Sequence, residues 1–416
     1  MRTLARILAL VLIFMIPWEG MIRFPGVGTA TKLIGFVVAG FWLATVIITG
    51  QLRKPRPFHL AVYIFVLWNA ASVFWSADPG RTFNFVLTWV QLGLLVFILW
   101  DLFTTRTILY AGLQSYIFGE YLAVGSAIAN FFSGNAFYTN YERFSSGDTN
   151  PDGFAFILVL GIPVAWYLAT SKQSFHFSNI LKWINIAYIP AALVGIALSG
   201  TRTALIASIP AMAYGISTLN RLSLRIKTLI LIFFVLAAVL LLPDLNSLRS
   251  FQRFRTTTSE ITTGDLNERT LIWRDGLATF VQHPLLGIGS NMYRSINTLG
   301  KVAHNSYLSI LIEVGLIGLS LFAIILAMAL TMAWAQPKWD SSFWLALLLV
   351  WSIGCFTLSW EYRKTTWLFL GLLVASAAIN ETNHQVKDHL ANKPVQNVLN
   401  PAQRLELPKV RMDQHR

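Results

Sequence analysis

Apolar residues gather in long runs along this chain, and polar residues are largely confined to the segments between the runs. Many of the runs approach the roughly 20 residues that a helix needs to cross a bilayer core. Inside such a core every backbone polar group must be satisfied within the protein, so these runs are expected to be helical. They predict twelve membrane-spanning helices, near 4–18, 33–50, 58–75, 83–100, 108–132, 153–170, 181–198, 203–219, 224–243, 305–333, 342–359 and 365–380.

The first run is short, so eleven spans are the alternative count. Arg2 and Arg6 precede it, as in a signal peptide, but it ends in Pro17-Trp18-Glu19 rather than in a small-residue cleavage site. An uncleaved first helix is therefore expected.

The predicted fold is an all-α polytopic membrane protein with one long, partly helical outer loop. Residues 1–243 hold nine spans, 244–303 form the loop, 304–380 hold three more spans, and 381–416 form a disordered inner tail. Loops as long as 244–303 are usually either functional or disordered, and the helical pattern within this one favours a function. The tail is polar and mixed in charge, so no site is expected there.

The composition agrees with this fold. Only 12% of residues are charged, against roughly a quarter in soluble domains. The short inner segments hold twelve lysines and arginines and the short outer loops hold seven, which places both termini in the cytoplasm and the long loop in the periplasm. Most of the net charge of +13 is thus explained by lysines and arginines that orient the spans, and no nucleic-acid partner is expected.

The single cysteine, Cys355, excludes an intrachain disulfide and a cysteine metal site.

Arg202 stands in a tight hairpin, Ser-Gly-Thr-Arg-Thr at 199–203, at the outer membrane boundary. An arginine near a bilayer is costly and usually has a partner. Its planar fork suits phosphate or diphosphate. Taken alone, Arg202 fits a snorkelling residue at a helix end better than a ligand-binding one.

A helix is predicted in the long loop, from a cap at Asp265 or Asn267 to about Gln282. At 100° per residue, Arg269 lies inside the apolar arc of this helix and Arg274 lies at its edge. A helix resting on the membrane body would therefore direct Arg269 inward. The alternative is that Arg269, near the helix end, turns out to water.

Of seven histidines, His283 and His304 are predicted to face outward, and His283 is expected to cap or pack. His304 stands at the amino end of a span, where the helix dipole lowers a histidine pKa and favours anions. Neutral imidazole could there accept a proton from an attacking hydroxyl, although a structural histidine is the alternative. Glu313 lies on the opposite helix face, in a stripe with Ser306 and Ser309.

Several motifs are absent from the sequence. It has no glycine-rich phosphate loop, no His-Glu-x-x-His and no Asp-x-Asp in the outer loops. The outer acids are scattered, so no metal site is expected.

Together, several stretches resemble the O-antigen ligase and polymerase superfamily, which joins bacterial glycans carried on undecaprenyl diphosphate. The matching stretches lie in the expected order between roughly 75 and 320. They are Trp-Ser-Ala-Asp-Pro at 75–79, Asn-Pro-Asp-Gly-Phe-Ala at 150–155, the hairpin at 199–203, residues 268–276, His-Pro-Leu-Leu-Gly-Ile-Gly at 283–289, and His304-Asn305 followed by Gly315 and Gly318.

The resemblance implies a metal-independent, inverting membrane glycosyltransferase without a cofactor. It would transfer a glycan from an undecaprenyl-diphosphate-linked donor to an acceptor hydroxyl at the outer face of the bacterial inner membrane. Diphosphate binding falls on Arg202 and Arg269, with Arg274 beside them, and activation or positioning of the acceptor falls on His304. Asn305 and Glu313 are expected to support the site. The expected partners are this donor, a glycan or lipid A-core acceptor, and membrane lipids.

Two stretches, Trp-Ser-x-Asp-Pro and Asn-Pro-x-Gly, favour the exopolysaccharide-polymerase branch. The hairpin also departs slightly from ligase spacing, since Leu205 stands three rather than four residues past Arg202. Transfer to a lipid A core is the alternative within the superfamily. Protein O-glycosylation is a third branch, for which an added outer domain would be expected.

A secondary transporter or lipid flippase is the alternative from another class. Such proteins need ionisable residues at mid-membrane. Here the spans are nearly free of charge apart from residues such as Glu120 and Glu313, and the arginines gather at one face. This distribution favours an enzyme.

Overall fold

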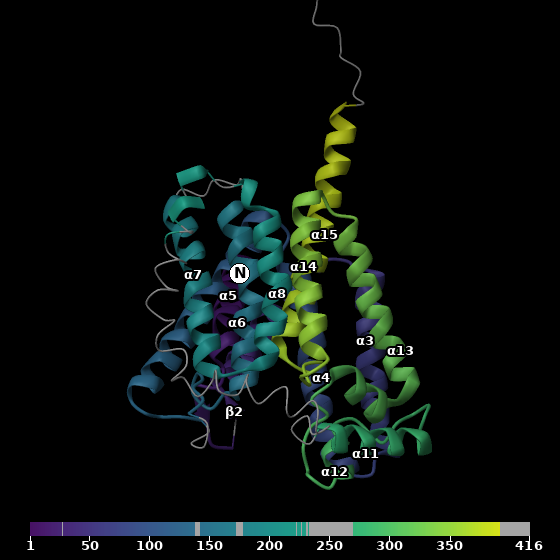
Figure 1. Ribbon diagram of the computed structural model, residues 1–416. Helices are drawn as coiled ribbons and strands as arrows, with labels where there is room; N and C mark the ends of the chain where they lie inside the picture. Colours follow the sequence, from purple (N-terminus) through teal and green to yellow (C-terminus); the bar gives the residue numbers. More distant parts are fainter. Residues whose placement is uncertain are drawn as a thin grey trace, which may run out of the picture.

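The computed structural model describes residues 1–26, 28–137, 142–171, 178–221, 223–225, 227–229, 232 and 269–391. This part of the chain is mostly helical, as predicted (Figure 1). It also contains a short antiparallel hairpin of β1 (Arg23–Phe24) and β2 (Gly28–Thr29), which the all-α prediction did not include. The turn of this hairpin carries Gly26 at φ 75°, a conformation that glycine adopts without steric cost.

Described helices coincide with eleven of the twelve predicted spans, while the ninth, near 224–243, lies mostly outside the described residues. The helices are α1 (Arg2–Met15), α2 (Ala30–Thr49), α3 (Pro57–Ala71), α4 (Pro79–Leu102), α5 (Arg106–Phe132), α6 (Pro151–Thr170), α7 (Ser178–Ser199), α8 (Arg202–Ser217), α11 (Arg269–Gln282), α12 (Tyr293–Ile296), α13 (Ser306–Trp334), α14 (Lys338–Cys355) and α15 (Lys364–Ala391). Short 3-10 turns, η1 (Ile16–Trp18), η2 (Ser72–Trp75) and η3 (Leu219–Arg221), follow α1, α3 and α8.

Six helices in the described part of the chain are long and apolar enough to cross a membrane: α2, α3 with η2, α4, α6, α7 and α13. This finding points to a membrane protein. The count of twelve spans is not confirmed and stays a prediction.

The helix α15 extends beyond the predicted span. The disordered tail was expected from Glu381, but the helix continues to Ala391. Residues 381–391 include good helix formers and no proline, the next proline being Pro394, so nothing local ends the helix earlier. The rest of the tail lies outside the described residues.

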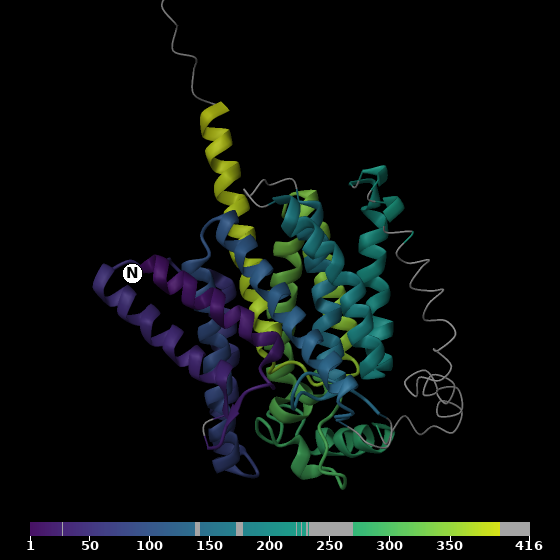
Figure 2. The same cartoon turned by 90° about the vertical axis from the view of Figure 1, so that its left-hand side faces the viewer.

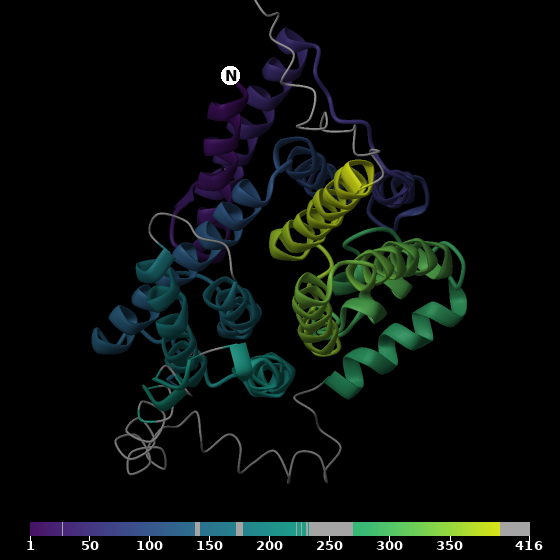
Figure 3. The same ribbon diagram turned by 90° about the horizontal axis from the view of Figure 1, so that it is seen from above.

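The helix α6 lies inside the bundle and packs against α5, α7, α8 and α14. Nearly all of its side chains are buried. A helix that is apolar on every face fits such a position. The helices α1 and α2 lie together at one edge of the bundle (Figures 2 and 3), and there α2 leaves most of its surface exposed.

Two ion pairs with buried acids lie toward one end of the bundle. Near the end where α15 leaves it, Arg2 pairs with the buried Asp101 at 2.8 Å, and Arg106 pairs with the buried Asp340 at 2.8 Å. The opposite end carries α11, α12 and the β1–β2 hairpin (Figure 1). Following the predicted orientation, we name these the inner end and the outer end.

Candidate functional site

The helix α13 is broken near its outer end. At Gly315 the backbone takes φ 70° and ψ −172°, which is not helical. A break leaves the N–H and C=O groups of the flanking turns without partners in their own helix. Within a membrane such groups are expensive unless something else pairs with them.

The segment 284–290, which follows α11, supplies these partners. On one side of the break, the Leu316 N–H donates to the Pro284 carbonyl at 2.9 Å. On the other side, the Gly289 N–H donates to the Glu313 carbonyl at 2.8 Å. The motif at 283–289 is therefore part of the hydrogen bonding of α13, and it fastens α11 to α13.

Two glycines allow this close approach. A Cβ atom at Gly315 would lie 2.0 Å from the Leu285 carbonyl oxygen, and one at Gly287 would lie 2.5 Å from the Glu313 carbonyl oxygen. Both glycines also have a φ of 70°, which side-chain-bearing residues rarely adopt. The break and the inserted segment thus depend on each other.

The motif at 75–79 packs on the same segment. The Trp75 indole N–H donates to the Leu286 carbonyl at 3.0 Å, and the Ala77 N–H donates to the Ile288 carbonyl at 3.3 Å. Two of the stretches that carry the family resemblance therefore build a structural junction.

The other stretches meet in a charged cluster at the start of α6. The Asn150 side chain caps this helix by accepting from the Asp152 N–H at 2.9 Å. The Asp152 carboxylate accepts from Arg143 at 2.6 Å and from the Thr201 hydroxyl at 3.1 Å. Arg143, which is buried, also donates to the Ser199 carbonyl at 2.7 Å. These contacts hold the hairpin before α8 against the start of α6.

Arg202 is the first residue of α8, and Arg269 is the first described residue of α11; the predicted cap at Asp265 or Asn267 lies outside the described residues. Burial is the main cause that lowers the pKa of Arg269 below its usual value, and the positive charge of Arg202 lowers it further. Asp152 acts in the opposite direction on the same guanidinium. The two arginines therefore share one electrostatic environment, in which an anionic ligand would relieve their repulsion.

His304 directly precedes α13 and its cap, with a φ of 50°. This left-handed conformation is uncommon for a residue other than glycine and recurs at functional sites. Burial, followed by the positive charge of Arg269, lowers the pKa of His304 to about 4, while Asp152 partly opposes the shift. At neutral pH the imidazole is uncharged and can accept a hydrogen bond. The predicted direction is correct, but burial rather than the helix dipole is the main cause.

Asn305 and Glu313 both accept hydrogen bonds from backbone N–H groups, Asn305 at the start of α13 and Glu313 at the start of α12. The Asn305 side chain caps α13 by accepting from the Leu308 N–H at 3.0 Å. The Glu313 carboxylate accepts from the N–H groups of Asn291 and Tyr293 at 2.8 and 3.2 Å. Both contacts are of the kind that a supporting residue makes.

Arg274 is exposed on α11. It stands five residues after Arg269, which turns it by about 140° around the helix. The structure therefore brings Arg202, Arg269 and His304 together but leaves Arg274 outside this group.

Sequence reasoning gave no role to Arg143 and did not assign Asp152 to the diphosphate site. Asp152 stands in the Asn-Pro-Asp-Gly stretch, so its motif was visible. Its pairing with Arg143 was not, because the two meet only when the outer segment folds back on α6.

Glu361, between α14 and α15, was also missed. Its side chain is buried, and no hydrogen bond of ordinary geometry reaches either carboxylate oxygen from the described residues. Burial raises the pKa of Glu361 to about 7, and the hydroxyls of Ser309 and Ser306 partly oppose this. The neighbouring Trp360 packs edge-to-face on Phe156 of α6, with ring centroids 4.5 Å apart. Glu361 therefore lies beside α13, close enough to Glu313 to act on it electrostatically.

Among the described residues, no three histidine, cysteine or acidic side chains lie close enough together to hold a metal ion. Metal independence stays a prediction.

The fold and the site define a helical membrane protein with a cluster of arginines, an acid and a histidine at one end. Residues 187–323, which include Arg202, Arg269 and His304, match the O-antigen ligase family. This match confirms the resemblance to the O-antigen ligase and polymerase superfamily. No curated protein sequence matches the chain.

Proposed function

We propose that this protein transfers a glycan from an undecaprenyl-diphosphate-linked donor to an acceptor hydroxyl at the outer face of the bacterial inner membrane. The main support is the joint position of Arg202 of α8, Arg269 of α11 and His304, which directly precedes α13 and its cap. The family match supports a role in glycan assembly.

In this proposal the donor diphosphate binds between Arg202 and Arg269. Guanidinium forks bind phosphate oxygens in pairs, and the bound anion offsets the repulsion between the two arginines. Arg143 serves a different purpose, since its hydrogen bonds to Ser199 and Asp152 hold the hairpin that presents Arg202.

His304 would accept a hydrogen bond from the acceptor hydroxyl. The acceptor oxygen then forms a bond to the anomeric carbon of the donor sugar, and the bond from that carbon to the diphosphate breaks. The hydroxyl proton passes to the imidazole, and the departing diphosphate carries its negative charge against the arginines. A single displacement of this kind inverts the anomeric centre.

Donor binding also prepares the histidine. Arg269 lowers the pKa of His304 in the free protein. A bound diphosphate offsets that positive charge, so the pKa of His304 rises in the complex and the imidazole becomes a better base.

A growing polysaccharide is the acceptor we propose first, with a lipid A core as the alternative. Both reactions use the same donor site and differ in what approaches His304.

The direct test uses purified protein in nanodiscs with a glycan-loaded donor. We expect release of undecaprenyl diphosphate that depends on the acceptor and is lost in Arg202→Ala. If the wild-type protein instead moves intact donor across a vesicle membrane without cleaving it, the chain is a transporter.

A further inference from the structure

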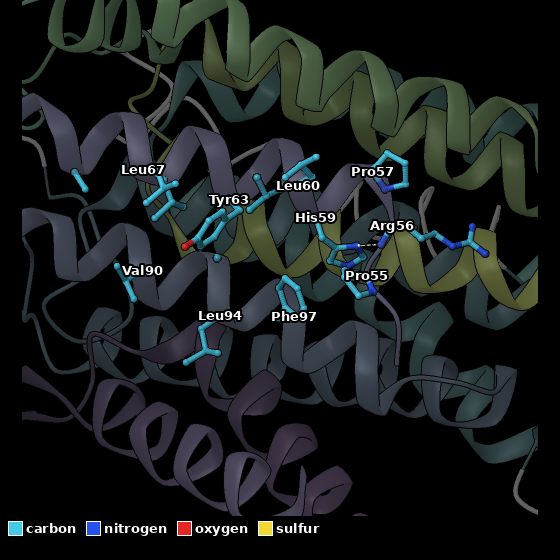
Figure 4. A pocket seen from close by; sticks show the side chains of 14 residues that line it. Pro55, Arg56, Pro57, His59, Leu60, Tyr63, Leu67, Val90, Leu94 and Phe97 are labelled. Atoms are coloured by element: carbon cyan, nitrogen blue, oxygen red, sulfur yellow. Dashed lines mark hydrogen bonds between the residues drawn. The ribbon is translucent and has the colours of Figure 1, made fainter. Parts of the chain in front are cut away.

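A groove of about 950 Å³ runs between α3 and α4 (Figure 4). Its lining comes from residues 55–70 and 90–97 and is almost wholly apolar. Leu60, Tyr63 and Leu67 of the lining are 59%, 57% and 48% exposed, so the groove opens away from the bundle. Because α3 and α4 are both candidate spans, that opening faces lipid.

The inner end of this groove, where α3 begins, is basic. Arg56 lines it and forms an ion pair with Glu381 at 2.8 Å. Lys54 is exposed nearby, and Arg53 lies over the Trp100 ring at 3.6 Å from its centroid. Basic pockets between membrane helices on the cytoplasmic side bind anionic lipid headgroups.

His59 adds an unused donor at the same end. It lines the groove, is 1% exposed, and accepts the Arg56 N–H on Nδ1 at 3.1 Å. A neutral ring with an occupied Nδ1 lone pair carries its proton on Nε2. Among the described residues, Nε2 has no hydrogen-bond partner.

We propose that this groove binds an anionic phospholipid of the inner leaflet. Its acyl chains would lie between α3 and α4, and its headgroup would lie at Lys54 and Arg56. The glycan donor is a poorer occupant, because its diphosphate is proposed to bind at the outer end, whereas the basic end of this groove is the inner one.

The test compares lipids on the full-length protein in detergent. We expect phosphatidylglycerol to raise the unfolding temperature of the wild type by several degrees more than phosphatidylcholine at equal mole fraction. The double variant Lys54→Gln/Arg56→Gln should lose this difference. The control Lys182→Gln removes a basic residue from α7, also near the inner end, and should keep it.

Each comparison is between two lipids on one variant, so a general loss of stability in the double variant does not affect it. Native mass spectrometry counts the bound lipids as a second readout. Equal shifts for both lipids in the wild type would overturn the proposal, as would a double variant that keeps the preference. A larger shift with polyprenyl phosphate would overturn it as well, because it would mark the groove as a donor site.

Discussion

At the scale of single residues, Arg202 is distinguished by its surroundings. It begins α8 beside a hairpin that Arg143 and Asp152 hold in place, and it acts electrostatically on Arg269. A snorkelling arginine needs no such arrangement, because its charged head is solvated by water or headgroups.

We expect Arg202→Lys to abolish most glycan transfer while the protein remains in the membrane. Lysine keeps the positive charge but cannot form the bidentate hydrogen bonds of a planar guanidinium group. Hydrogen bonds to charged groups are worth about 1.5–3 kcal/mol, so the loss should reach roughly 10²-fold in transfer rate. Arg23→Lys is the matched control, since Arg23 is exposed and lies 3.8 Å from an exposed partner, Asp148. Full activity in Arg202→Lys would mean that Arg202 contributes only a positive charge at the membrane boundary and does not bind the diphosphate.

Substitutions at His304 and Arg269 should affect different steps, the first the chemical step and the second donor binding. His304→Ala should lower single-turnover rate by about 10²–10⁴-fold with donor binding retained, because it removes a general base. Arg269→Ala should weaken donor binding first, because the diphosphate contact exists before the chemistry begins. Both quantities can be measured in nanodiscs. Normal turnover of bound donor by His304→Ala would place the base elsewhere, and we would then test Glu361.

The pH dependence follows from the lowered pKa of His304. Protonation blocks a base, and in the free protein it occurs only near pH 4. The kcat/KM profile reports the free protein, so its acid limb should lie near pH 4. The kcat profile reports the complex with donor, so its acid limb should lie at higher pH, because bound diphosphate favours the imidazolium. Arg269→Gln should move the first limb to higher pH, since Arg269 lowers this pKa. A limb near pH 7 in both profiles, unmoved in Arg269→Gln, would indicate Glu361 instead.

The three central residues could be predicted from sequence, but their electrostatics could not. Arg202 begins α8 and His304 directly precedes the cap of α13, which hydropathy and motifs indicate, while helical periodicity turns Arg269 toward the membrane body. Asp152 and Glu361 depend on which chain segments cover them, and no local pattern encodes that.

At the scale of elements, the break in α13 is the main departure from the predicted span. The apolar run near 305–333 is continuous, so hydropathy describes a single straight helix. The break depends on backbone partners from 284–290, which periodicity does not register. Its visible signals were the glycines of the two matching stretches, 283–289 and Gly315.

Gly315→Ala tests this junction. The new Cβ would lie 2.0 Å from the Leu285 carbonyl oxygen at a φ of 70°, so the inserted segment must shift. A strained backbone position costs about 1–3 kcal/mol, and lost hydrogen bonds add to it. We expect a clearly lower unfolding temperature and reduced transfer.

Gly125→Ala is the control for this substitution. Gly125 lies within α5, and a Cβ atom there would meet nothing within 4 Å, so alanine should be neutral or slightly stabilising. Equal unfolding temperatures for the two variants would mean that the junction is not held as tightly as its hydrogen bonds indicate.

At the scale of the whole molecule, hydropathy predicted a helical membrane protein and the positions of most helices. It could not predict that α6 occupies the interior while α1 and α2 lie at an edge. That choice depends on packing between segments far apart in the chain.

Metal independence is a prediction for the full-length protein. If arginines stabilise the departing diphosphate, transfer should survive millimolar EDTA unchanged. Loss of activity that Mg²⁺ or Mn²⁺ restores would mean that a carboxylate cluster takes part.

The junction at Gly315 also links two residues of the site. Segment 284–290 is hydrogen-bonded into α13, and Trp273 of α11 donates to the Ala303 carbonyl at 2.8 Å. Arg269 and His304 therefore belong to segments that are hydrogen-bonded to each other, whereas Arg202 begins α8, which packs on α6 and α14. A shift of α8 relative to α13 would change the distance between the two arginines and would leave the contacts between α11 and the start of α13 in place.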